Sequence, residues 1–100
     1  MSTLISDTTQ AAAVSVNSKL FKVRQGEIAV VRSTNLDGSA VITLYYDSPE
    51  GGVDNPATFD DGTGVTLTPT NPERLINIPG TYRVAVTSAS TTSGIVFVNQ

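Results

Sequence analysis

The chain of 100 residues contains no cysteine, no histidine and no tryptophan. The lack of cysteine excludes disulfides, thiolate nucleophiles and sulfur-bound metals. The lack of histidine removes the commonest general base, so a serine nucleophile has no imidazole to activate it. Ser18 and Lys19 cannot act as a pair from one strand, because neighbouring strand residues point to opposite faces. We therefore predict that the protein is not an enzyme, and we expect no cofactor.

Charge is also scarce. Charged residues make up 15% of the chain and the net charge is -3, which favours neither nucleic acid nor an anionic membrane as a partner. No stretch approaches the ~20 apolar residues of a membrane span. Residues 1–18 lack the basic start of a secretory signal, so we expect synthesis in a cytoplasm without export.

What the chain does have is an abundance of Thr, Val, Ser and Ile, the residues of pleated, half-buried surfaces. Their alternation predicts an all-β fold, an antiparallel β-sandwich of seven or eight strands, although closure into a barrel stays open. Residues 1–17 are expected to form an extended N-terminal arm, with a possible strand at 14–17, and residues 18–100 the sandwich domain. The strands expected in that domain are 19–24, 27–32, 40–46, 58–59, 65–68, 75–78, 81–88 and 95–98, and a turn is expected at 35–38.

One corner carries a fold resemblance. The run from Ile78 to Val86 includes Pro79, Gly80 and Tyr82, and it resembles the E–F corner of immunoglobulin-like and fibronectin-type sandwiches. The resemblance implies that the Tyr82 ring lies in the core and that its hydroxyl bonds to the backbone a few residues upstream. Because the cysteines and the tryptophan of antibody domains are missing, it implies an Ig-like fold without antibody-like recognition.

The whole chain also resembles the small β-sandwich proteins of tailed-phage virions. The resemblance rests on its short Thr/Val/Gly-rich composition, its start without an export signal, and the Pro-Gly-Thr-Tyr-Arg strand followed by a final apolar strand. It implies a structural virion protein, chiefly a decoration protein on the capsid lattice, in contact with the major capsid protein or other virion subunits and present in many copies or as a homo-oligomer. A tail, fibre or head–tail connector role is the first alternative. A carbohydrate- or protein-binding module is the second.

The arm and the basic segment after it are the predicted interface. The expected contact residues are Leu4, Ile5, Val14, Val16, Lys19, Lys22 and Arg24. An arm of this kind typically adds a strand to a neighbouring subunit. The alternative is that it folds back on its own sandwich. Similarly, the final run at 95–98 is apolar on both faces, which requires either a central strand or a covering subunit.

The remaining clusters have plain structural explanations beside functional ones. The acids Asp47, Glu50, Asp54, Asp60 and Asp61 are typical of a solvated loop, with a Ca²⁺ site as the alternative. They are also compatible with head-to-tail docking against the basic residues 19–32. The interpretation we favour is that both charged segments are solvated faces, whose charges keep strand edges from pairing. Adjacent Tyr45 and Tyr46 place one ring inward and one outward, too little for a sugar-stacking platform. The other aromatic residues, Phe21, Phe59, Tyr82 and Phe97, are expected in the core.

Overall fold

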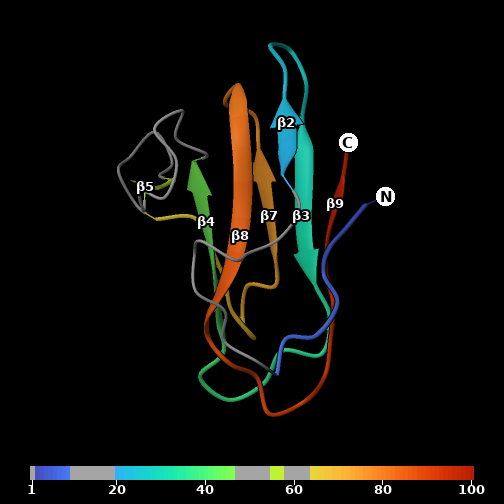
Figure 1. Ribbon diagram of the computed structural model, residues 1–100, viewed down its shortest axis with the longest axis vertical. Helices are drawn as coiled ribbons and strands as arrows, with labels where there is room; N and C mark the ends of the chain where they lie inside the picture. Colours follow the sequence, from blue (N-terminus) through green and yellow to red (C-terminus); the bar gives the residue numbers. More distant parts are fainter. Residues whose placement is uncertain (1, 10–19, 47–54, 58–63) are drawn as a thin grey trace.

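The computed structural model describes residues 2–9, 20–46, 55–57 and 64–100, and these contain strands and no helix. Two antiparallel sheets lie face to face as a β-sandwich (Figure 1). The four-stranded sheet has the order β1-β9-β3-β7, and the five-stranded sheet has the order β2-β8-β4-β5, with β6 also pairing with β4. The strands are β1 (Ser2–Ile5), β2 (Phe21–Val23), β3 (Ala29–Ser33), β4 (Val41–Tyr46), β5 (Asn55–Pro56), β6 (Thr66–Leu67), β7 (Glu73–Ile76), β8 (Gly80–Ser88) and β9 (Val96–Asn99).

The all-β prediction is confirmed, and most expected strands recur within one or two residues of their predicted ends. The β3–β4 connection contains the expected turn, in which Gly38 adopts a φ of 61°, a conformation that glycine reaches without a Cβ clash. Two strands differ from expectation: β7 begins and ends two residues early, and β5 was not foreseen. The strands expected at 14–17 and 58–59 lie outside the described residues.

The first residues of the expected arm form a strand of the sandwich itself. β1 pairs antiparallel with β9, with Ser2 opposite Val98 and Thr3 opposite Phe97. In Figure 1 the blue N-terminal segment runs beside β9, and the two chain ends lie together. This makes nine strands among the described residues rather than seven or eight. β9 therefore lies between β1 and β3, which is the first of the two alternatives expected for its apolar sequence, a central strand.

The core fills the space between the inward faces of the two sheets. Alternation decides which residues enter it: Ile42 and Leu44 of β4 point inward, as do Val84 and Val86 of β8. The other buried apolar members are Leu4, Phe21, Val23, Ala29, Val31, Ala57, Val65, Leu67, Ile76, Tyr82, Val96 and Val98. One expected member is missing, because Phe97 lies half-buried on the outward face of β9, and the core expectation for it is wrong. Phe97 is paired with the exposed Arg32 of β3, so the neighbouring residues Val96 and Val98 are the ones that point inward.

Tyr82 is the largest fully buried side chain of this core and lies near the start of β8. Its ring is 1% exposed and lies against Phe21, with ring centroids 5.6 Å apart, and against Tyr46 at 5.1 Å. Its hydroxyl donates a hydrogen bond to the carbonyl oxygen of Ile78, four residues upstream. Burial, with Tyr46 beside it, raises the pKa of the Tyr82 hydroxyl to about 12. Tyr82 thus ties the β7–β8 corner, which contains Pro79, to the core.

Candidate docking groove

An open groove of 320 Å³ lies where the edges of the two sheets meet. β1 forms one edge of the four-stranded sheet, and β2 forms one edge of the five-stranded sheet. Residues far apart in sequence therefore meet here. The lining residues are Leu4, Leu20, Phe21, Lys22, Arg24, Glu27, Val98 and Gln100.

The apolar part of the groove is the end of the hydrophobic core. Leu4, Phe21 and Val98 are inward-facing residues that are at most 6% exposed, yet each borders the groove. Leu20 precedes β2 and is 54% exposed, so it offers apolar surface that the chain's own fold does not bury. An apolar side chain entering the groove would remove Leu20 from water and extend the core.

The polar rim carries an excess of positive charge. Lys22 and Arg24 are exposed, and neither forms an ion pair among the residues that the structure describes. The carboxylate of Glu27 accepts hydrogen bonds from the backbone N–H of Arg24 at 3.1 Å and from the side-chain amide of Gln100 at 3.2 Å. The same amide of Gln100 donates to the backbone oxygen of Lys22. Glu27 is thus held by neutral donors, and two cations remain at the rim to meet an acidic partner.

The structure brings three of the predicted interface residues together. Leu4, Lys22 and Arg24 line the one groove, and Ile5 lies at the end of β1, half-buried against the core. The predicted contact residues Val14, Val16 and Lys19 lie outside the described residues. Leu20 was not among the predicted contact residues, although an apolar residue that alternates with Lys22 and Arg24 on one face of a strand is a visible signal. Gln100 was not predicted either, because its position depends on the pairing of β9.

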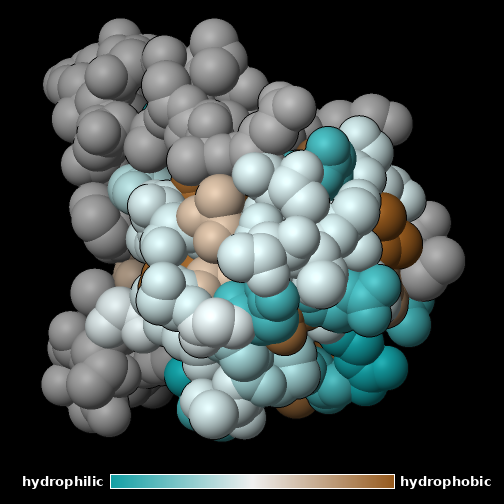
Figure 2. Space-filling view, turned by 90° about the horizontal axis from the view of Figure 1, so that it is seen from below, coloured by the Kyte–Doolittle hydropathy of each residue, from teal (hydrophilic) through white to brown (hydrophobic). Residues whose placement is uncertain are grey.

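The opposite end of the molecule is a polar network that holds the N-terminal segment in place. Thr8 is fully buried, and its hydroxyl accepts a hydrogen bond from the N–H of Gly94 at 3.0 Å. Its backbone bonds to Gly94 and to Ser90 in the β8–β9 loop. Figure 2 shows this end as largely hydrophilic or neutral, with separate hydrophobic patches. The segment after β1 is therefore fastened to the chain's own β8–β9 loop.

Asp37 joins the β3–β4 loop to the same network. Its carboxylate accepts hydrogen bonds from the hydroxyl of Ser90 at 2.7 Å, from the backbone N–H of Thr91 at 2.7 Å and from the Thr91 hydroxyl. These donors, the Thr91 hydroxyl first, lower the pKa of Asp37 to about 2. All of its partners are in one loop, so the arrangement fixes loop geometry and leaves the carboxylate little capacity for a ligand.

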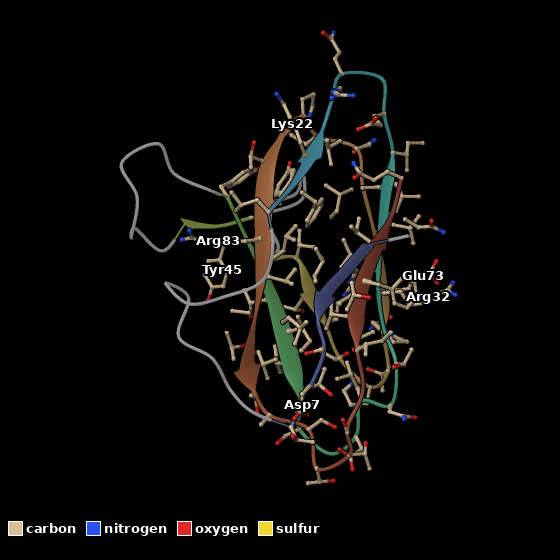
Figure 3. All side chains as sticks on the ribbon, turned by 45° about the vertical axis from the view of Figure 1, so that its right-hand side comes forward. Asp7, Lys22, Arg32, Tyr45, Glu73 and Arg83 are labelled. Atoms are coloured by element: carbon tan, nitrogen blue, oxygen red, sulfur yellow. The ribbon has the colours of Figure 1, made fainter. Side chains whose placement is uncertain are left out.

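The other candidates from the sequence offer no second site. All five acids of residues 47–61 lie outside the described residues, and within those residues no group of Asp or Glu is placed to hold a metal. Tyr45 faces away from the core but is only 8% exposed, in register with Arg83 on β8. Figure 3 shows both side chains on the same outward side of the five-stranded sheet. Tyr45 therefore presents no open ring for a sugar.

Comparison with protein families, curated proteins and solved structures gave no match for this chain. None of its described segments forms a helix that is long and apolar enough to cross a membrane.

Proposed function

We propose that the protein is a structural component of a tailed-phage virion, a decoration protein that docks onto the capsid lattice through the groove between β1 and β2. The observation that carries this proposal is the meeting of Leu4, Lys22 and Arg24 around one cavity. These residues were expected at an interface from two separate segments of the sequence. A groove with an apolar floor and a basic rim has the anatomy of a protein-docking site.

We also propose an Ig-like arrangement for four of the strands, β3, β4, β7 and β8. In immunoglobulin sandwiches strand B pairs with E, and strand C lies beside F. β3 pairs with β7 and β4 pairs with β8 in the same way, with Tyr82 at the corresponding corner. The last strand departs from the family, because β9 pairs with β3 and β1 rather than with β8. The likeness is therefore to the β3–β7 and β4–β8 pairs, and it does not extend to a hairpin of the last two strands.

The docking mechanism follows from the groove's chemistry. An apolar side chain of the major capsid protein inserts beside Leu20, and a neighbouring carboxylate pairs with Lys22 or Arg24. The charge contact mainly accelerates and orients the encounter, and the apolar contact slows dissociation. Each contact is small, so stable decoration depends on many copies bound to one symmetric lattice.

The test is co-sedimentation with undecorated capsids assembled from the major capsid protein of the same genome. The variant Lys22→Gln/Arg24→Gln removes both rim cations. The matched control Thr70→Glu/Asn71→Asp lowers the net charge by the same amount in an exposed turn away from the groove. We expect the wild-type chain and the control to sediment with capsids, and the rim variant to stay in the supernatant.

Two outcomes would redirect the proposal. Binding to purified tails and not to capsids would assign the tail or connector role to the same groove. A specific signal on a glycan array, without binding to either particle, would favour the recognition module instead. Equal binding by the rim variant and the control would show that the groove is not the docking site.

A further inference from the structure

The outward face of the four-stranded sheet carries a second surface, formed by β3 and β7 on the side of the sheet opposite to β1. Val30 lies directly opposite Leu75, and Arg32 lies directly opposite Glu73 in the same pairing. Leu75 is 52% exposed, and nearby Ile28 is 53% exposed. Together Ile28, Val30 and Leu75 form an apolar patch beside the Arg32–Glu73 pair, a combination typical of an interaction surface.

The ion pair on this face is electrically balanced. Nε of Arg32 donates to Oε2 of Glu73 at 2.7 Å, and a second guanidinium nitrogen of Arg32 also bonds to this oxygen. Both side chains are about half exposed, and in Figure 3 they lie side by side, pointing away from the other sheet. An exposed pair of this kind adds little stability to its own fold. The positive and the negative group can therefore also form ion pairs with a second surface that carries the opposite charge at each of the two positions.

The register makes this face complementary to itself. A two-fold axis parallel to the strands, midway between β3 and β7, exchanges the positions of directly opposed residues. Val30 of one copy then meets Leu75 of the second copy, and Arg32 meets Glu73, each contact occurring twice. An isologous interface has this property, in which residue i contacts j and j contacts i. We propose that two copies of the chain associate through this face.

A second copy fits better than a partner of one charge sign. The pair sums to zero, so the face attracts neither an acidic nor a basic protein, and its apolar residues match only an apolar patch of similar size. The patch holds three apolar residues, well below a standard interface of about 800 Å² per partner. The association is therefore weak, with a dissociation constant on the order of 0.1–1 mM. This proposal of self-association does not depend on whether the groove binds a capsid.

Sedimentation equilibrium of the isolated protein up to about 1 mM tests the proposal. We expect concentration-dependent dimers of the wild-type chain, weakened at high salt. The single variants Arg32→Glu and Glu73→Arg each place like charges at both contacts between position 32 of one copy and position 73 of the other. The association constant of each variant should therefore be about tenfold lower. An equimolar mixture of the two variants restores opposite charges at both contacts between unlike copies. The mixture should therefore regain dimers close to the wild-type level.

Two further variants separate this face from the groove and from misfolding. Leu75→Lys removes apolar contact at an exposed position, so it should abolish dimers while unfolding as cooperatively as the wild-type chain. Lys22→Gln should leave dimerisation unchanged, because Lys22 lines the groove. A wild-type chain that stays monomeric at the highest concentration overturns the proposal. So does a mixture that dimerises no better than its two components.

Discussion

Replacing Leu4 by alanine tests whether the N-terminal strand belongs to the fold of the isolated chain. Leu4 is 6% exposed and sits in the core, while Thr3 beside it on β1 is exposed. Removing buried methylene groups from Leu4 costs about 0.8 kcal/mol each, and buried Leu-to-Ala changes span roughly 2–5 kcal/mol. Leu4 borders an open groove, so no sealed cavity remains and the lower end applies. We expect a loss of about 2–3 kcal/mol.

The assay is urea and thermal unfolding of Leu4→Ala beside Thr3→Ala as the matched control. A loss of 2–3 kcal/mol corresponds to a fall in Tm of roughly 10–20 °C for a domain of this size. The control should lose no more than about 0.5 kcal/mol, because its side chain is in solvent. At micromolar concentrations, well below the dissociation constant of the proposed dimer, the wild-type Tm should not depend on protein concentration. If both variants unfold alike, residues 2–5 do not pack on their own sandwich in solution, and the reasoning from the β1–β9 pairing fails.

Three other changes test the corner and the polar end. Tyr82→Phe leaves the Ile78 carbonyl without its donor and should cost about 1–1.5 kcal/mol in urea unfolding. Asp37 has a folded pKa of about 2 against an ordinary value of 3.8, so the stability it contributes is present above pH 4 and is lost as the pH falls towards 2. Asp37→Asn should therefore flatten the dependence of Tm on pH in that interval, and an unchanged slope would refute the assignment. Gly94→Ala would place a Cβ 1.9 Å from the backbone oxygen of Thr34, and the forced shift of the β3–β4 loop should cost about 1–3 kcal/mol in thermal unfolding.

The sequence was most informative where one strand alternates clearly between its faces. The pattern from Ala40 to Tyr46 identified β4, and the Pro-Gly-Thr-Tyr run identified the corner at which Tyr82 enters the core. Both signals are local, because a strand's face is set by its own period of two. Phe97 shows the limit of this reasoning. Its strand is apolar on both faces, so only the pairing with β3 decides that Phe97 points outward.

Non-local pairing also explains what was missed at the groove. β1 is short and partly polar, and its strand character depends on β9 at the far end of the chain. The groove exists only because this pairing places Leu4 near β2. The predicted list contained Leu4, Lys22 and Arg24, yet nothing in the sequence indicated that they share one cavity. Local patterns therefore led to the prediction of these residues as contacts, which stays a prediction, and the fold brings three of them to one groove.

The two proposed surfaces are centred on different sides of the four-stranded sheet, and they adjoin where Ile28 follows Glu27. The groove is at the β1 edge of the four-stranded sheet, and the self-association face is centred on β3 and β7, which end the sheet on the other side. A copy docked through its groove thus keeps its β3–β7 face open towards a neighbour. On a lattice the effective concentration of neighbouring copies reaches the millimolar range, so a contact too weak to dimerise the free protein fully is then largely formed. Binding of the wild-type chain to capsids should consequently rise cooperatively with protein concentration. The Leu75→Lys variant should bind an isolated capsid site with similar affinity, but its binding curve should show no cooperativity.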